Sequence, residues 1–551
     1  MKKVKRKKPK PRQKVALLSV YHKEGIVDFA RALMELGWAL IASGGTAKVL
    51  AEAGLLVKDV AKLSGRGPIL DHRVVTLVPE IHGGLLALPK HLQELKRLGI
   101  PWIDLACVDL YPLEAEVNRP GATRESVIEK TDIGGPTMLR AGAKGRRIVV
   151  ADPADRPKVI EFLKKGKEVV AWHTEEFITE LAAKAEGIVT AYTLVSARYH
   201  SDGAIDGMVG TEVRRCKYGE NPWQNPAGLY SVGSNDPLAL DKFELIEGTD
   251  PSFINYTDID RLLQTVTHIA AVFAVNSDVL GAVPYIAVGV KHGNACGAAV
   301  SYDYRTEAIE RMLSGDPRAI FGGVVMTTFS IGELEAKTLL YALTTGGQRR
   351  LLDCVIAPSF TEAAKDVLAR KGGKCRLFAN AALAKLTSDS LDSSTRLRQV
   401  RGGFLRQPNY QFILRATRWD QYGELAPLQS RRADLLLAWA IGSTSTSNTI
   451  TLVRSGRLIG NGVGQQDRVG AAQLAIRRAT EAGHATAEAV AYSDSFFPFV
   501  DGPAALAEAG ITAILASSGS VKDEEVKAFC KGKGVTLCLI PDTTGRGFFG
   551  H

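Results

Sequence analysis

Apolar and polar residues alternate with two different periods over residues 15–150. Short apolar runs at 15–20, 38–43, 103–112 and 146–153 predict strands. Between the first runs, 25–37 and 46–54 have helical spacing, and apolar residues of the first helix fall at 26, 27, 29, 30, 33, 34 and 36. Strands that alternate with helices predict a parallel sheet covered on both faces, so the first domain is expected to be α/β.

The pattern divides the rest of the chain into further parts. Residues 174–200 predict a long helix that closes the first domain, and the glycines and polar residues after it indicate a boundary. Strands that end in loops are expected at 285–293, 319–328 and 351–360. A second α/β block follows from about residue 420, with predicted elements at 431–444, 448–465, 468–483, 489–494, 502–510 and 512–518. The expected division is a tail at 1–14, a domain at 15–200 and a domain at 201–551, subdivided near 400–430.

The formal charge of the chain is concentrated at its beginning. Residues 1–14 carry nine Lys and Arg and no acid, and removing these nine charges from the total of +10 leaves about +1. We expect this tail to be disordered and solvated, because its charges repel and it has almost nothing to bury. Contact with nucleic acid is therefore expected only through the tail.

The apolar runs and the cysteines indicate in which cellular compartment the protein is expected. No uninterrupted run reaches the roughly 18 apolar residues that span a bilayer, and "VALLSVY" runs directly into "HKEG" without a cleavage site. Seven scattered cysteines without a C-x-x-C pair argue against a disulfide framework or a zinc site. We expect a reduced, cytoplasmic protein that needs no metal and contacts no membrane.

Three loops stand where ligands collect in α/β sheets, at the carboxyl ends of predicted strands. "SGGT" at 43–46 suits a phosphate, with Lys23 nearby, although an ordinary tight turn explains four residues about as well. "TDIGGPTMLRAGAK" at 131–144 places Asp132 before two glycines, and Arg140 and Lys144 on one helix face. "VKHGNACGAAV" at 290–300 puts Lys291 and His292 after a buried strand, where a histidine is often only structural. No P-loop lysine motif is present, so ATP hydrolysis is not expected.

In their order along the chain, these loops and five further segments resemble a known family. The segments are "SGGTAKVLAEAGL", "HRVVTLVPEIHGGLLA", "DIGGPTMLRAGAK", "CKYGENPWQNP", "VKHGNACGAAV", "SNTITLVRSGRLIGNGVGQQDRV", "SDSFFPFVDG" and "SSGSVKDEEV". They resemble the bifunctional purine biosynthesis proteins, which fuse IMP cyclohydrolase with aminoimidazole carboxamide ribonucleotide (AICAR) transformylase. The resemblance covers about residues 15–551. It implies a methylglyoxal-synthase-like first domain and a second region of two cytidine-deaminase-like α/β subdomains without their zinc.

The resemblance also implies a reaction and partners. A formyl group passes from 10-formyltetrahydrofolate to the 5-amine of AICAR, and the ring then closes with loss of water to give IMP. The family's small-molecule substrates are the nucleotide and the folate. The resemblance implies a homodimer with transformylase sites at the subunit interface, and it allows a structural monovalent cation.

Site residues follow from the resemblance position by position. For formyl transfer, His292 matches the base, Lys291 the group that stabilises the oxyanion, and Asn448 the residue that orients the histidine. For ring closure, Lys144 and Asp132 match the activating residues. The expected nucleotide-binding and folate-binding positions are Lys23, Ser43, Gly44, Gly45, Thr46, Arg73, Thr76, Tyr111, Ile133, Lys217, Tyr218, Asn255, Asp353, Arg468, Phe496, Asp501, Ser518, Gly519 and Arg546.

The chain departs from the family pattern at several of these segments. Val75 and Val78 replace a lysine and a histidine, Tyr21 a serine and Asp109 an asparagine, which weakens the case for ring closure. In the second region Lys217, Trp223, Ala295, Asp467 and Val500 are replacements, Ser443 and Thr446 stand where lysines are common, and Gly547 takes an arginine's place. We therefore expect that formyl transfer is retained more readily than ring closure. Two alternatives stay open: a relative that only transfers the formyl group, and a non-catalytic protein that binds nucleic acid through its tail.

Overall fold

The computed structural model describes residues 12–65, 67–165, 171–423 and 431–549. The chain separates into two compact units, residues 1–211 (unit 1) and 212–551 (unit 2), which are described one after the other. The basic tail lies outside the described residues up to position 11. At its end the Arg12 guanidinium pairs with Asp104, and the Lys14 ammonium lies 5.2 Å from the ring centroid of Trp38.

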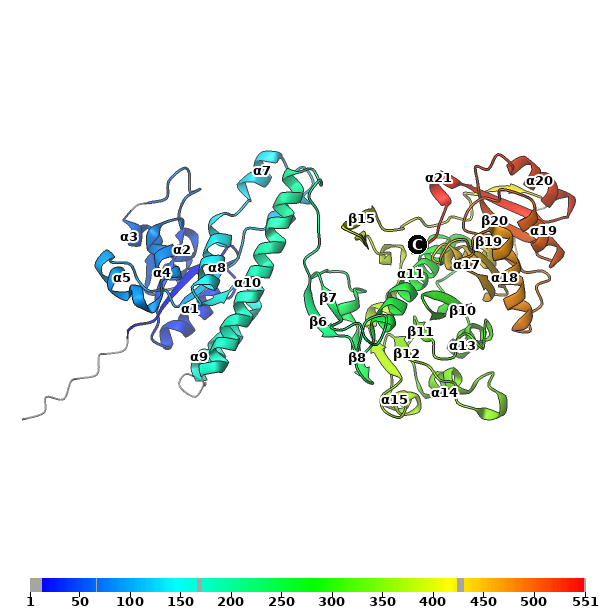
Figure 1. The fold of residues 1–551 in the computed structure, drawn as a ribbon, viewed down its shortest axis with the longest axis horizontal. Coiled ribbons are helices and arrows are strands. Elements are labelled where there is room, and N and C mark those ends of the chain that lie inside the picture. Colours follow the sequence, from blue (N-terminus) through cyan, green and yellow to red (C-terminus); the bar gives the residue numbers. More distant parts are fainter. Residues whose placement is uncertain (1–11, 66, 166–170, 424–430, 550–551) are drawn as a thin grey trace, which may run out of the picture. The chain divides into compact units, whose positions relative to one another are not determined.

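Unit 1 contains the parallel sheet that the alternating pattern predicts. Its strand order is β3-β2-β1-β4-β5, and every pair is parallel. The strands are β1 (Val15–Ser19), β2 (Ala39–Ala42), β3 (Val57–Asp59), β4 (Leu105–Val108) and β5 (Ile148–Val150). Helices cover the sheet (Figure 1): α1 (Ile26–Glu35), α2 (Gly44–Glu52), α3 (Val60–Ser64), α4 (Pro79–Leu86), α5 (Leu92–Leu98), α6 (Leu113–Val117), α7 (Arg124–Glu129), α8 (Gly134–Lys144), α9 (Arg156–Lys165) and α10 (Ala171–His200).

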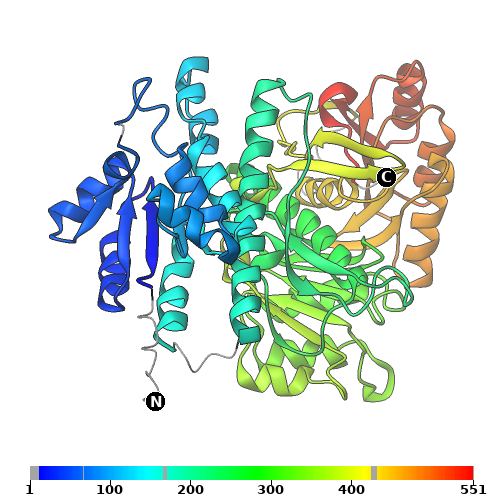
Figure 2. The same ribbon diagram turned by 60° about the vertical axis from the view of Figure 1, so that its left-hand side comes forward.

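Two apolar clusters hold unit 1 together, one on each face of the sheet. Successive side chains of a strand point to opposite faces, so Ala16 and Leu18 of β1 join one cluster while Leu17 joins the other. The first cluster packs against α1, α2 and α9, and the second against α4 and α8. The long helix α10 lies against α8 and β5 (Figure 2). The fold class predicted for this domain is confirmed.

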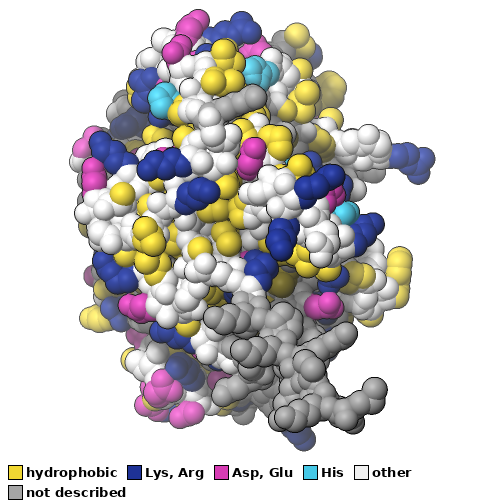
Figure 3. Space-filling model, turned by 90° about the vertical axis from the view of Figure 1, so that its left-hand side faces the viewer, with side chains coloured by type: hydrophobic (Ala, Val, Ile, Leu, Met, Phe, Trp, Pro, Cys, Tyr) yellow, Lys and Arg dark blue, Asp and Glu magenta, His cyan; other side chains and the backbone are white. Residues whose placement is uncertain are grey.

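One face of the molecule, over unit 1, shows how the charge of the described residues is distributed (Figure 3). Lysines and arginines are interspersed with acids and with apolar side chains, and they form no continuous basic stripe on this face. This mixture agrees with a body whose net charge is close to zero once the tail is set aside.

Unit 2 is built on one 12-stranded sheet in the order β16-β21-β20-β19-β17-β18-β10-β9-β11-β12-β13-β8. Its strands are β8 (Glu244–Glu247), β9 (Tyr285–Lys291), β10 (Asn294–Ser301), β11 (Val324–Thr327), β12 (Cys354–Ala357), β13 (Arg376–Ala379), β16 (Asp420–Tyr422), β17 (Ile450–Arg454), β18 (Arg457–Gly462), β19 (Val490–Ser493), β20 (Ala513–Ser518) and β21 (Thr536–Pro541). Two hairpins lie outside it, β6 (Thr211–Arg215) with β7 (Gly228–Ser231), and β14 (Thr395–Val400) with β15 (Gly403–Pro408).

The helices of unit 2 form two layers. The helices α11 (Phe253–Val275) and α17 (Arg432–Gly442) are almost entirely buried and pack on each other. Two further apolar clusters involve the remaining long helices, α13 (Arg305–Ser314), α14 (Glu333–Tyr341), α15 (Glu362–Leu368), α18 (Arg468–Glu481), α19 (Asp501–Glu508) and α20 (Asp523–Gly532). The short helices are α12 (Ser277–Leu280) and α21 (Asp542–Gly545).

The sheet of unit 2 contains the same arrangement twice. A first block (residues 244–379) runs strand, buried helix, hairpin, then three helix–strand pairs, and a second block (residues 420–541) repeats this order. The strand orders are also equivalent, β10-β9-β11-β12-β13-β8 and β18-β17-β19-β20-β21-β16. The blocks join where β10 pairs with β18. Two α/β blocks were expected from the sequence, and the structure adds that they share one sheet.

The structure differs from the sequence-based expectation at residues 285–301. A strand ending in a loop was expected, but β9 returns as β10 after two residues, His292 and Gly293. Both have positive φ, 52° and 72°, the combination that a tight turn between antiparallel strands requires. Among the described residues, no helix is long and apolar enough to cross a membrane.

Candidate active sites

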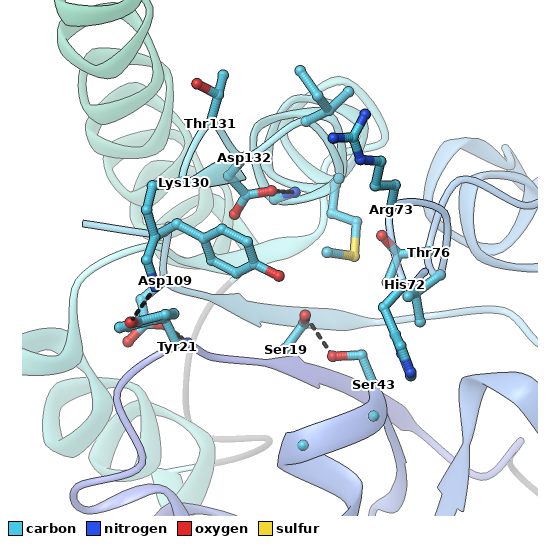
Figure 4. Close-up of a pocket in the computed structure, with 18 of the residues that line it drawn as sticks. Ser19, Tyr21, Ser43, His72, Arg73, Thr76, Asp109, Lys130, Thr131 and Asp132 are labelled. Atoms are coloured by element: carbon cyan, nitrogen blue, oxygen red, sulfur yellow. Dashed lines mark hydrogen bonds between the residues drawn. The ribbon is translucent and has the colours of Figure 1, made fainter. Parts of the chain in front are cut away.

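Unit 1 has a cavity of about 740 Å³ at the carboxyl ends of β1, β2 and β4 (Figure 4). Most of its lining comes from three kinds of segment: the loops that follow these strands, residues 71–77, and residues 128–135 ahead of and at the start of α8. Met138 and His200 complete the lining. Parallel strands direct their following loops to one edge of a sheet, and this is where open α/β sheets bind ligands.

The "SGGT" segment forms one wall of this cavity. Helix α2 begins at Gly44, and the hydroxyl of Ser43 lies 2.7 Å from that of Ser19. The Lys23 ammonium donates to the Val20 carbonyl and, at 3.4 Å, to the Thr46 hydroxyl. Burial lowers the pKa of Lys23, because desolvation disfavours its charged form. A helix N-terminus beside an ammonium group suits an anionic ligand.

Asp132 lies where the chain enters α8. Its carboxylate accepts the Gly135 N–H at 2.7 Å, and its own backbone N–H donates to the Tyr192 hydroxyl of α10 at 2.7 Å. Burial raises the pKa of Asp132. A Cβ at Gly135 would collide with this carboxylate, which explains why a glycine stands there. The carboxylate is thus fixed at the cavity with a raised proton affinity, as a group that exchanges protons needs.

One of the departures from the family pattern, Asp109, has a structural role at the cavity. The Asp109 carboxylate is buried and accepts the backbone N–H groups of Tyr21 and, at 3.2 Å, His22. Its negative charge therefore holds the loop after β1. Val75 borders the cavity, whereas Val78 is the residue before α4 and does not.

The predicted nucleotide positions of unit 1 all line the cavity. These are Lys23, Ser43, Gly44, Gly45, Thr46, Arg73, Thr76, Tyr111 and Ile133. Asp132 lines it too, but Lys144 does not. Lys144 is the exposed last residue of α8, so an 11-residue helix of about 16 Å separates it from Asp132. Within this chain the structure does not bring the two predicted ring-closure residues together.

In unit 2 the predicted base stands on the turn between β9 and β10. His292 is exposed, and the neighbouring Lys291 ammonium donates to the Phe321 carbonyl at 2.7 Å. An imidazole next to an ammonium group offers a base and a cation within one turn. A tight turn presents both side chains from a backbone fixed by the strands on either side.

Two residues of α11 support this turn, and sequence reasoning missed both. The Asp258 carboxylate accepts the Gly293 N–H at 2.7 Å. Arg261 donates to the carbonyls of Gly293 at 3.0 Å and Phe549 at 2.6 Å, and to that of Thr444 at 3.2 Å. Burial raises the pKa of Asp258 and lowers that of Arg261 to about 10. The spacing of these residues, three apart on one helix, was the one signal available from the sequence.

The structure brings Asn448 and Arg468 to the same region. Asn294, two residues after His292, accepts the Thr446 N–H at 3.0 Å through its side-chain oxygen. Asn448 follows and donates through its side chain to the Gln465 carbonyl at 2.9 Å. Next to it, the Thr449 carbonyl accepts the N–H of Asp494, whose buried carboxylate pairs with Arg468 at 2.5 Å. One continuous set of contacts thus links the predicted base to these two positions.

Several other predicted positions gather at the carboxyl ends of β19, β20 and β21. The Arg546 guanidinium lies 5.6 Å from the ring centroid of Phe496 and pairs with Asp542. Asp542 also accepts hydrogen bonds from Ser495 and Ser517, next to Ser518 and Gly519. Asp501 is exposed, and its carboxylate accepts a hydrogen bond from the backbone N–H of the next residue, Gly502.

The remaining positions lie around the first strands and α11. The Tyr218 carbonyl accepts the N–H of Phe253, at the start of α11, and Lys217 is exposed beside it. Asn255 is buried, and its side-chain oxygen accepts the Ser252 N–H at 2.9 Å, so it caps α11. Asp353 forms a 3.4 Å ion pair with Arg370 ahead of β12. Within the described residues no three His, Cys, Asp or Glu side chains group as metal ligands would.

The chain has a cavity of about 740 Å³ in a parallel α/β unit and a histidine–lysine turn in a second α/β unit. Comparison with known families agrees: the MGS-like domain matches residues 25–137, and the AICARFT/IMPCHase bienzyme matches residues 143–478. The second match covers more than half of the chain, and the chain therefore belongs to the AICARFT/IMPCHase bienzyme family, enzymes of purine biosynthesis. The resemblance identified from the motifs is confirmed.

One similar solved structure is described as "Crystal structure of ForH". It is 34% identical in sequence, with 35% of this chain and 100% of that chain covered and a TM-score of 0.32.

Proposed function

We propose that unit 2 transfers a formyl group from 10-formyltetrahydrofolate to the 5-amine of AICAR. The observation that carries this proposal is the exposed His292 beside Lys291, on a turn held by Asp258 and Arg261. The amine of AICAR is a weak nucleophile because its lone pair is delocalised into the ring and carboxamide. A positioned base and a cation near the carbonyl oxygen supply what the reaction lacks.

Formyl transfer would proceed by addition of the amine to the formyl carbon, followed by loss of the folate nitrogen. The amine nitrogen bonds to the formyl carbon while His292 takes an amine proton, and the carbonyl pair moves onto oxygen beside the Lys291 ammonium. The oxyanion then re-forms the carbonyl, the bond to the folate nitrogen breaks, and that nitrogen takes a proton. The products are formyl-AICAR and tetrahydrofolate.

Ring closure in unit 1 is the second part of the proposal. The α2 N-terminus and Lys23 would hold the phosphate, and Asp132 would accept the carboxamide proton as its nitrogen attacks the formyl carbon. Loss of water from the adduct gives IMP. Because the reaction is intramolecular, positioning alone supplies much of its rate.

A chain that only transfers the formyl group is the second candidate. Two observations favour it: Val75 borders the cavity where the family pattern has a lysine, and Lys144 lies outside the cavity. The homodimer and the cytoplasmic location also belong to the proposal, on the strength of the family resemblance. In such a dimer the partner subunit would complete the transformylase site around the exposed His292.

The test supplies the full chain with AICAR and 10-formyltetrahydrofolate and follows tetrahydrofolate release and IMP formation separately. Release of both products supports the bifunctional proposal. Tetrahydrofolate release with IMP formation no faster than the uncatalysed rate selects the second candidate. Absence of tetrahydrofolate release, at a protein concentration where the chain is dimeric, rejects formyl transfer.

A further inference from the structure

Two ammonium groups that form no ion pair among the described residues border the cavity of unit 1. Within the described part of the chain, neither Lys23 nor Lys130 forms an ion pair, whereas Arg73 is paired with Glu129. Lys23 lies beside the "SGGT" wall, where the phosphate is expected. Lys130, in the loop ahead of α8, belongs to a different part of the lining and was not singled out by any motif.

Lys130 makes a specific contact with Tyr21. Its ammonium donates a hydrogen bond to the Tyr21 hydroxyl at 2.9 Å and lies 4.9 Å from the centroid of the same ring (Figure 4). This hydrogen bond raises the pKa of Lys130, so the amine stays protonated. An ammonium group has only donors, so the phenol oxygen is the acceptor and its own hydrogen is directed elsewhere.

Both partners stand on anchored backbone. The Tyr21 N–H donates to the buried Asp109 carboxylate, and the Tyr21 ring lies 5.3 Å from that of Tyr111. The Lys130 carbonyl accepts a hydrogen bond from Tyr192 of α10 at 3.1 Å. The two side chains meet across the cavity lining from loops that are each fixed, which makes their contact a built feature and not a chance surface encounter.

The surroundings of the pair determine what it can bind. Asp109 and Asp132 also line this part of the cavity, so a second phosphate here would face two carboxylates. A neutral oxygen acceptor carries no such penalty. Such an acceptor would receive a hydrogen bond from the Tyr21 hydroxyl. The hydroxyl is a stronger donor here because its oxygen already accepts a hydrogen bond from the Lys130 ammonium.

We propose that Tyr21, backed by Lys130, donates a hydrogen bond to an exocyclic carbonyl oxygen on the base of the bound nucleotide. The pair would select nucleotides that carry this oxygen and would hold the carboxamide in place. The inference rests on the proposed nucleotide-binding function of unit 1 and adds the group on the ligand that the cavity recognises.

The test compares two ligands by calorimetric titration of the full chain. One is IMP, and the other is purine riboside 5′-monophosphate, which has hydrogen in place of the C6 oxygen. We expect the unaltered chain to prefer IMP, and Tyr21→Phe to lower IMP affinity about tenfold while leaving the second ligand unchanged. Lys130→Met should reduce the preference less, because the phenol remains.

Lys158→Met is the matched control, since Lys158 also lies over an aromatic ring, at 5.7 Å from Phe177, but outside the cavity. A Tyr21→Phe chain that keeps the full preference for IMP would overturn the inference, as would equal binding of both ligands by the unaltered chain. In both cases nucleotide binding by unit 1 stands. An unaltered chain that binds neither ligand rejects the proposed function of unit 1 itself.

Discussion

Two hairpin turns in unit 2 have the same backbone conformation but differ in their side chains. In the first block the turn is Lys291-His292-Gly293-Asn294, and in the second it is Arg454-Ser455-Gly456-Arg457. The φ angles of the central residues are 52° and 72° in the first turn and 53° and 71° in the second. The repeated block therefore builds the same two-residue turn twice.

The support behind the two turns is also the same. A carboxylate of the buried helix accepts the glycine N–H at 2.7 Å in each block, from Asp258 of α11 and from Asp434 of α17. Burial raises the pKa of both carboxyl groups. Because both blocks have the aspartate, it belongs to the architecture of the turn. The histidine is present in the first block alone, and Arg261 has Leu437 at the corresponding helix position, three residues after the aspartate.

The strongest test of this comparison replaces the first central residue of each turn, His292 or Ser455, with alanine. We expect His292→Ala to lower formyl transfer by roughly 10² to 10⁴, because the base is lost, while closure of supplied formyl-AICAR continues. Ser455→Ala should leave transfer unchanged and stability within about 0.5 kcal/mol. Tetrahydrofolate release measures the first effect and thermal unfolding the second. Equal losses from both substitutions would mean that the turn matters only for folding.

Arg261 is present in the first block only, where it holds the turn that carries His292 in position. Replacing it with leucine, the residue of the second block, removes the bonds to the Gly293 and Phe549 carbonyls. We expect kcat for formyl transfer to fall roughly 10-fold to 100-fold, since small displacements of a base are costly. An unchanged kcat in the leucine variant would contradict the positioning role, and Arg261→Lys should recover part of the rate.

His268 gives the first block a titratable ring in its buried helix. It is fully buried, its Nδ1 lies 2.8 Å from the Gln264 carbonyl, and its ring stacks on Tyr410. Burial lowers the pKa of His268 from 6.5 to about 4. The unfolded chain therefore takes up a proton at a higher pH than the folded chain does.

The direction of the pH effect follows from this difference. Above pH 6.5 both states are neutral, and between 6.5 and about 4 the free energy of unfolding should fall by about 3 kcal/mol. Denaturant titrations that follow the unfolding of unit 2 at several pH values in this range measure how the free energy of unfolding changes with pH. His268→Phe, which keeps a stacking ring, should flatten it by that amount. An unchanged slope in the variant would show that other groups dominate acid unfolding.

Unit 1 shows how far sequence patterns lead when strands are parallel. The "SGGT" loop, Tyr111 and Asp132 come from three separate segments, and all border one cavity because parallel strands end at one edge. The family resemblance assigned Lys144 and Asp132 to the same ring-closure step, but helix α8 carries Lys144 to its far end. A motif gives spacing along the chain, and a helix converts spacing into distance at about 1.5 Å per residue.

In unit 2 the sequence indicated His292, Lys291, Asn448 and Arg468 but not what holds them. Arg261 and Asp258 are 32 and 35 residues from Gly293, the turn residue that they contact. They lie in a buried helix whose few polar residues stand among apolar ones. Asn255 looked like a ligand-binding residue, and its side chain caps α11. Such roles depend on which element packs against which.

The amino-acid sequence by itself determined the class of fold, the order of the elements and the residues with chemical potential, because periodicity and turn chemistry are local properties of the chain. The tertiary structure decided the rest: that the two blocks join in one sheet, that one turn is braced by Arg261, and that Lys130 meets Tyr21 in the cavity. These are contacts between distant segments, and their energies depend on burial and distance that no local pattern contains.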